Sequence, residues 1–124
     1  ERRVRVQGGL NVVELDAESL EQAWGVTING PAEAELYLNV RSEQLALDGM
    51  VWTYEGGVLP ESALLNLPET TALDIVQGDH HVNILAPSAD VSFPSGLVTG
   101  NLVAASLSGG GQVNCGHFGG GLGR

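Results

Sequence analysis

The chain has 124 residues, of which 43% are hydrophobic and 16% charged, and this composition predicts one folded domain with a buried core. Fifteen acidic residues oppose five arginines, and there is no lysine, so the net charge is -10. Such a charge excludes nucleic-acid binding, which needs clustered Lys and Arg, and it disfavours anionic membranes. No apolar run approaches the ~18 residues that would span a bilayer.

The first residue is Glu1 rather than Met, so we expect a processed product or a fragment of a longer protein. A single cysteine, Cys115, cannot form an internal disulfide. Cysteine usage therefore leaves the redox compartment open.

One helix is expected, over residues 16–24. Asp16 is a suitable N-cap, and Glu18 lies in the first turn, where a negative charge is favourable. Leu20 and Trp24 are four residues apart and would share one face, and Gly25 would end the helix.

The rest of the chain reads as short strands separated by turn residues. Their even spacing is typical of a sandwich, a barrel or a solenoid. The expected strands are residues 3–7, 10–15, 25–28, 35–40, 44–47, 51–54, 63–67, 71–76, 80–85, 90–93, 97–98, 101–104 and 112–114.

An internal repeat favours the solenoid. Residues 83–89 read NILAPSA, and residues 101–107, which are 18 positions further on, read NLVAASL. A weaker copy precedes them, with LNLP at residues 65–68. We therefore predict an all-β fold, a β-solenoid (β-helix) with coils of about 18 residues and one short flanking helix. Asn83 should stack on Asn101, with Ala86 and Ala104 pointing inward.

Several segments resemble the choice-of-anchor A domain family. The similarity covers residues 10–40, the segment LLNLPETTAL at 64–73, the segment NILAPSADV at 83–91, and the closing coils at 96–118. Leu67 departs from the family pattern, which has an aromatic residue there, and Arg41-Ser42 replaces the usual Ser-Gly. The family's glycine-rich N-terminal half has no counterpart before Glu1.

This resemblance implies a secreted bacterial cell-surface domain with a β-helical, adhesive character and a separate C-terminal anchor. It supplies no catalytic residues. We divide the chain into an N-terminal strand or arm (residues 1–9), a β-solenoid domain that corresponds to the C-terminal part of the family domain (residues 10–119), and a glycine-rich tail (residues 120–124).

The histidines and the cysteine are the first candidates for chemistry. His80 and His81 follow Asp79, but neighbouring residues of a strand point to opposite faces, so structural or solvated roles are expected. Cys115 and His117 would share one strand face without a second ligand pair or an oxyanion element. There is also no Gly-x-Ser-x-Gly motif. We therefore predict no catalytic, cofactor or metal site, and no enzyme.

The acidic and glycine-rich corners have structural explanations. Turn capping is expected for the aspartates near predicted corners, with loose Ca²⁺ binding as the alternative. The glycine runs at residues 109–111 and 119–121 should form turns and a tail, because no lysine follows them as in a phosphate loop. The aspartates in question are Asp48, Asp74, Asp79 and Asp90.

Hydroxyl and aromatic side chains point to two possible ligands. The hydroxyl residues could form an ice-binding face, but threonine does not recur at one coil position. Four aromatic residues could form a carbohydrate platform, although packing against the solenoid is the favoured role. The two sets are Thr70, Thr71, Ser92, Thr99, Ser106 and Ser108, and Trp24, Tyr37, Trp52 and Tyr54.

The sequence thus predicts a non-catalytic, extracellular structural or adhesive module. The alternative is a surface domain with a defined ligand, which could be a collagen-like protein, a glycan or ice. Because a solenoid exposes strand edges at its ends, we expect a homo-oligomer or fibre, with the first strand and the terminal coils at the junction. Pairing with a separate upstream half-domain is the other possibility.

Overall fold

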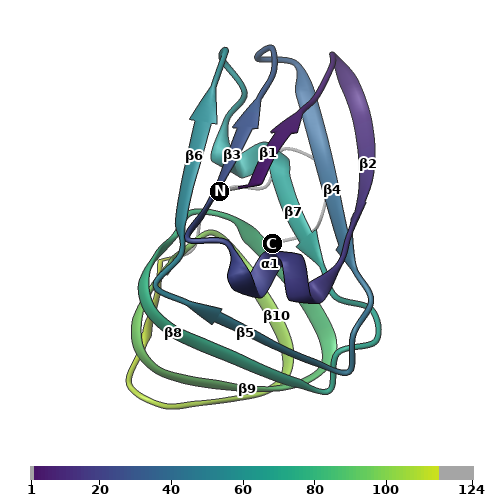
Figure 1. Cartoon of the computed structure of the whole chain (residues 1–124). Helices are drawn as coiled ribbons and strands as arrows, with labels where there is room; N and C mark the ends of the chain where they lie inside the picture. The colour runs from purple at the N-terminus through teal and green to yellow at the C-terminus, as the bar shows by residue number, and fades with distance from the viewer. Residues whose placement is uncertain (1, 115–124) are drawn as a thin grey trace.

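The computed structural model describes residues 2–114 and shows a mostly β fold (Figure 1). This part of the chain contains one short helix, α1 (Ala17–Gln22), one 3-10 turn, η1 (Pro60–Ser62), and eleven strands. The predicted mostly β class with a single short helix is confirmed. The strands are β1 (Arg2–Arg5), β2 (Gly9–Leu15), β3 (Gly25–Asn29), β4 (Ala34–Val40), β5 (Gln44–Asp48), β6 (Val51–Glu55), β7 (Ala63–Asn66), β8 (Ala72–His80), β9 (Asn83–Thr99), β10 (Leu102–Ser108) and β11 (Gln112–Asn114).

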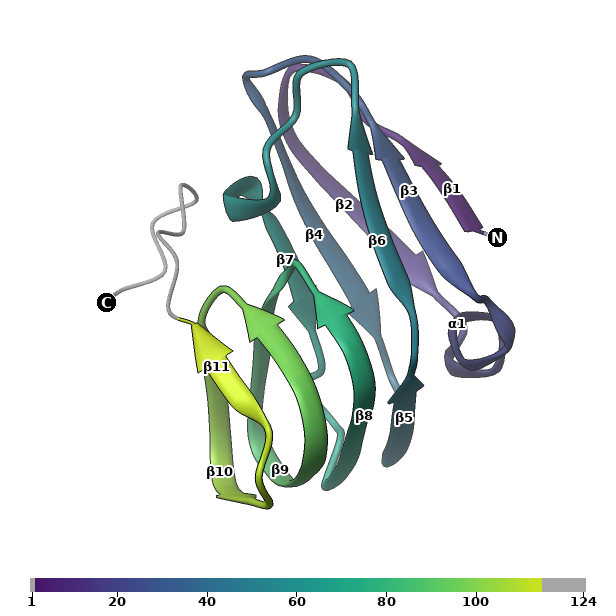
Figure 2. The same cartoon turned by 90° about the vertical axis from the view of Figure 1, so that its left-hand side faces the viewer.

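All the strand pairs in the described part are parallel. One sheet has the order β1-β3-β6, and the other has the order β2-β4-β7-β9-β8-β5, with β10 and β11 also pairing with β9. The second sheet is strongly curled, because β8, β9 and β10 bend around the lower half of the molecule (Figures 1 and 2). Each pass of the chain therefore lies on the previous pass and runs in the same direction.

The residue spacing between passes changes along the chain. Ile84 pairs with Leu102, which is 18 residues further on, as the sequence repeat predicts. Leu38, however, pairs with Leu65, which is 27 residues further on. The expectation of uniform 18-residue coils is therefore wrong for the N-terminal passes, which are longer because they contain α1 and the segment 56–62 with η1.

The largest difference in strand boundaries is in β9. The sequence predicts separate strands at residues 80–85, 90–93 and 97–98, whereas residues 83–99 form one bent strand. Residues 84–86 and 90–92 of this strand pair with β10, and residues between 90 and 98 pair with β8. The turn signals between the three segments thus change the direction of the strand without ending it.

A buried asparagine connects successive passes. The Asn83 side chain is buried, and its Oδ1 atom accepts a hydrogen bond from the Asn101 backbone N–H at 2.9 Å. Its Nδ2 atom donates to the carbonyl oxygen of Ala63 at 3.0 Å. The predicted stacking of Asn83 and Asn101 is confirmed, and it satisfies backbone groups at a corner where no ladder bond reaches them.

Inward side chains form continuous rows along the stack. Leu38, Leu65 and Ile84 are in register, and each is at most 1% exposed. Ala86 is fully buried and pairs with Ala104, which is half-buried and packs against the core. The predicted inward position is thus confirmed for both alanines, with the tighter packing at Ala86.

The helix covers one edge of the curled sheet. Asp16 Oδ2 accepts a hydrogen bond from Ser19 N–H at 3.3 Å, which confirms the predicted N-cap. Leu20 is buried, and Glu21 Oε2 accepts a hydrogen bond from the Ala46 N–H of β5 at 2.8 Å. The helix thereby covers the apolar side of this edge with Leu20. It also supplies a hydrogen-bond acceptor to β5, the edge strand of the sheet.

Tight corners require glycine where the passes approach most closely. Gly100 has a φ of 148°, and a Cβ atom there would lie 2.7 Å from the Val82 carbonyl oxygen. A side chain at this position would therefore force apart the corner that joins β9 to β10. No helix in residues 2–114 has the length and apolar character to cross a membrane.

We expect Ala86→Leu to lower the free energy of unfolding by about 1–3 kcal/mol, because the added carbons would overpack a position with no free space. Urea unfolding would measure the change. Ala72→Leu is the matched control, since Ala72 is exposed on a strand, and its midpoint should stay near that of the wild type. Equal midpoints for both variants would contradict the packing described for Ala86.

Candidate functional site

The two adjacent histidines lie on opposite sides of the chain. His80 is buried, where its Nδ1 atom accepts a hydrogen bond from Trp52 Nε1–H at 3.3 Å and its Nε2 atom lies 2.8 Å from the Gln77 carbonyl oxygen. His81 is half-buried, and its Nε2 atom lies 2.8 Å from Asp79 Oδ2. The two rings thus lie in different environments, as the alternation of neighbouring strand residues predicts.

Desolvation governs the ionisation of the groups around Trp52. Burial lowers the pKa of His80, although the Gln77 and Val76 backbone and the carboxylates of Asp79 and Asp48 act in the opposite direction. A neutral His80 is also what its contacts require, since one ring nitrogen must accept from Trp52 while the other donates to Gln77.

Tyr54 lies close to this pair. Its hydroxyl donates a hydrogen bond to the His81 carbonyl oxygen. Burial raises the pKa of the Tyr54 phenol, so the group remains a donor.

His81 has no arrangement for nucleophilic catalysis. Asp79 binds His81 through Oδ2, and its Oδ1 accepts a hydrogen bond from Thr99 Oγ1 at 3.2 Å. The carboxylate therefore lies between the hydroxyl and the imidazole, whereas a triad places the imidazole between the other two groups. Cys115 and His117 lie outside the described residues.

The corner aspartates are the candidates for loose Ca²⁺ binding. Within residues 2–114, no group of three or more His, Cys, Asp or Glu side chains could hold a metal ion. Asp90 accepts a hydrogen bond from Ser106 Oγ at 2.7 Å, as a capping role predicts. Loose Ca²⁺ binding at Asp48, Asp74 or Asp90, all of them exposed, stays a prediction.

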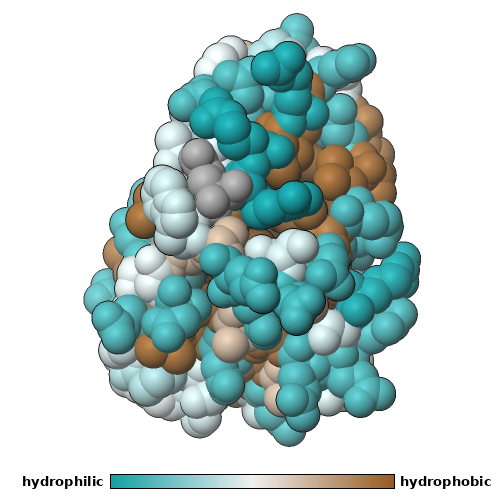
Figure 3. Space-filling model, viewed as in Figure 1, coloured by the Kyte–Doolittle hydropathy of each residue, from teal (hydrophilic) through white to brown (hydrophobic). Residues whose placement is uncertain are grey.

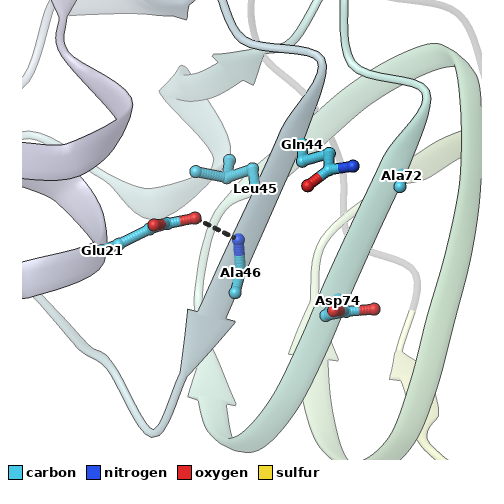
Figure 4. Close-up of a pocket in the computed structure, with 6 residues that line it drawn as sticks. All are labelled: Glu21, Gln44, Leu45, Ala46, Ala72 and Asp74. Carbon is cyan, nitrogen blue, oxygen red and sulfur yellow. Dashed lines mark hydrogen bonds between the residues drawn. The ribbon is translucent and has the colours of Figure 1, made fainter.

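A shallow hollow of about 300 Å³ lies between α1, β5 and β8 (Figure 4). Its lining includes Glu21, Gln44 and Asp74, and the Glu21 carboxylate points to the Ala46 amide rather than into free space. The hollow combines small side chains with carboxylates and an amide. Such a lining supplies contacts but no nucleophile.

The hydroxyl candidates do not form one face. Thr70 is buried and donates to the Ser42 carbonyl oxygen at 2.7 Å, while Thr99 bonds to Asp79. Ser92 and Ser108 do pair in register and are exposed. A second in-register pair, Thr27 with Thr53, escaped the sequence prediction because its 26-residue spacing differs from the 18-residue repeat.

The aromatic candidates divide into buried and exposed members. Trp52 is buried and Tyr54 packs against the core, which confirms the predicted packing role for both. Trp24 is 66% exposed, so its predicted packing against the stack is wrong. The helix ends at Gln22 and Ala23 is extended, so Trp24 leaves the helix face that Leu20 occupies.

An exposed apolar surface lies over β2 and β4, and we call Leu10, Val12 and the half-buried Tyr37 the β2–β4 outer face. Leu10 is 59% exposed and Val12 57% exposed, and Tyr37 pairs with Val12 in register. Figure 3 shows hydrophobic side chains in brown on the upper right of the molecule, where β2 and β4 lie in Figure 1. Sequence reasoning missed this face, because apolar residues occupy both sides of β2.

A polar rung borders the β2–β4 outer face. Asn39 Nδ2 donates to Glu14 Oε2 at 2.9 Å, and Asn66 Nδ2 donates to Asn39 Oδ1 at 2.9 Å. Arg41 Nε lies 3.4 Å from Glu14 Oε1. These contacts join three neighbouring strands and hold the surface rigid.

The fold and these solvent-facing rows define a rigid scaffold that presents side chains on its outer surface. The chain belongs to the family described as "Putative Ice-binding-like adhesive domain", whose model matches residues 3–115. No curated protein and no solved structure matches the chain. The family is adhesive and non-catalytic in type, in keeping with the adhesive character implied by the choice-of-anchor A resemblance.

We expect the free energy of unfolding to fall as the pH drops below about 6.5. The unfolded chain takes up a proton on His80 that the folded chain resists, so stability is present above this pH and is lost below it, by at most about 1.4 kcal/mol per pH unit. Urea unfolding between pH 7.5 and 5.5 measures the slope. His80→Phe should flatten it, and a wild-type slope in this variant would refute the assignment.

Proposed function

We propose that the chain is a non-catalytic, extracellular adhesive module built as a β-solenoid. Parallel pairing at offsets that approach 18 residues in the C-terminal half supports the solenoid. Membership of an adhesive family supports the binding role. The resemblance to choice-of-anchor A domains supports a location at a bacterial cell surface.

The observation that carries the adhesive role is the β2–β4 outer face. Leu10 and Val12 leave more than half of their surface in water, and both lie on β2, which pairs with β4 along its whole length. An exposed apolar patch with a polar border is typical of an interaction site. Because the polar rung from Glu14 to Asn66 is already hydrogen bonded, binding would order few side chains, which lowers its entropic cost.

The ligand class stays open among a collagen-like protein, a glycan and ice. A flat apolar strip beside fixed amide groups suits the first two, since each offers apolar faces and hydrogen-bonding groups. The family description makes ice a necessary test. Against it, Thr27 of the in-register threonine pair is 2% exposed and therefore cannot contact an ice lattice.

Self-association is part of this proposal. Strands β1, β2 and β10 stand at the two ends of the stack, where parallel pairing can continue. A homo-oligomer or fibre would use these ends. A separate upstream half-domain could instead occupy the N-terminal end.

We expect the immobilised chain to retain one of three probes, namely type I collagen, a member of a glycan array, or ice. Val12→Ser with Tyr37→Ser should weaken retention roughly 10-fold or more by removing the apolar contact. Val51→Ser, at a side chain that is 51% exposed elsewhere, is the matched control. Retention of none of the probes, or equal retention by the double variant and the control, would overturn the proposal.

A further inference from the structure

The C-terminal end of the stack is an open strand edge. In the described part of the chain, β10 pairs along one edge only, with β9 (Figure 2). Val91 of β9 faces the core, and its partner Leu107 on β10 is the last residue of that row of inward side chains. Val91 is 2% exposed, whereas Leu107 is 53% exposed. Leu102 is likewise only half-buried, although its partner Ile84 is fully buried.

This end also lacks charge. Residues 91–114 contain no Asp, Glu, Lys or Arg, in a chain with a net charge of -10. The carboxylate that bonds to β10 is Asp90, which contacts Ser106 on the outer side. Exposed edge strands are usually protected from further pairing by charged side chains, and β10 carries none.

The N-terminal end differs in its charge and in its cover over β5, although β2 also pairs along one edge only, with β4. Leu20 of the helix packs against this end, and Glu21 accepts a hydrogen bond from the β5 edge. Strand β1 carries Arg2, Arg3 and Arg5, of which Arg3 pairs with Glu55 at 3.1 Å. Two N-terminal ends would therefore bring like charges together, while the C-terminal ends have no such penalty.

We propose that β10 pairs antiparallel with β10 of a second copy, around a two-fold axis between Ala104 and Ala105. A two-fold contact places each surface against itself, so it requires an uncharged, self-complementary edge. In this register Leu102 faces Leu107 of the second copy on the inward side, and Val103 faces its Ser106 on the outward side. The exposed ends of both cores are thereby buried.

The bend of β10 fits this arrangement. The register of β10 on β9 shifts between Ala104 and Ser106, which marks the corner between two sides of the stack. A two-fold axis at that corner places residues 102–104 of one copy opposite residues 105–107 of the other. One closed dimer results, and the charged N-terminal ends point outward. The inference specifies the self-association proposed above and is independent of the ligand.

Cross-linking tests the register directly. Opposed residues in an antiparallel pair have Cα atoms about 4.5–5.5 Å apart, within the range that a disulfide spans. In a Cys115→Ser background, we expect Val103→Cys chains mixed with Ser106→Cys chains to form a disulfide-linked dimer on mild oxidation. Thr53→Cys chains, with the cysteine at an exposed strand position, replace the Ser106→Cys chains in the control mixture, which should stay unlinked. Equal cross-linking of both mixtures, or of neither, overturns the register.

Sedimentation of the full chain tests the dimer itself. We expect twice the monomer mass of 12.9 kDa at micromolar concentration, unchanged between low and high salt because no charges meet. Leu107→Asp should weaken dimerisation roughly 30-fold or more, with an unaltered circular dichroism spectrum. Val12→Asp, at the other end, should leave the dimer intact. A monomeric wild type, or a salt-sensitive series of larger species, overturns the proposal.

These outcomes separate the dimer from the adhesive role. Loss of ligand retention with an intact dimer would count against the β2–β4 outer face alone. A monomer that still retains its ligand would count against the β10 interface alone.

Discussion

The fold depends on backbone hydrogen bonds between one pass of the chain and the next. Ile84 N–H donates to the Asn101 carbonyl oxygen and Leu67 N–H to that of Leu85, each at 2.8 Å. A buried backbone group without a partner costs roughly 1–3 kcal/mol, so a pass cannot shift without losing several such bonds at once. The position of every side chain is consequently set by that of the residue one pass away. Asn83 extends this rule to a corner, where its side chain replaces the missing ladder bonds.

The same constraint explains why function should be sought on the outer faces. Inward positions are committed to aliphatic rows, and a substitution there acts on stability first. Outward positions such as Val12 and Tyr37 are aligned by the ladder, and Val12 leaves 57% of its surface exposed to solvent. The buried Trp52–His80 hydrogen bond shows the opposite case, because a polar pair in the core must be fully satisfied and therefore fixes one protonation state.

Local sequence reasoning succeeded where the repeat and the strand period agree. The 18-residue repeat predicted the contact of Asn83 with Asn101, since identical residues at one spacing imply stacking. It could not predict the longer N-terminal passes, whose extra residues have no copy elsewhere in the chain. Trp24 was misplaced because the helix ends two residues before it, and a weak helix end has no strong sequence signal. Val12 was missed because alternation identifies the outer side of a strand only when that side is polar.

A stack of parallel passes always has two ends, and the chain treats them differently. At the first, α1 covers the β5 edge, and the arginines of β1 oppose pairing with a second arginine-rich end. At the second, within the described residues, β10 pairs along one edge only and has neutral side chains, and Leu107 is exposed at the end of the core. Joining two such ends would bury apolar surface without bringing charges together, and it would stop growth at a dimer, because the remaining ends repel. The dimer would also present two β2–β4 outer faces, so a weak contact at each could combine into firm attachment to a repetitive surface. The neutral C-terminal end would then allow the dimer to form, and the charged N-terminal end would limit assembly to that dimer.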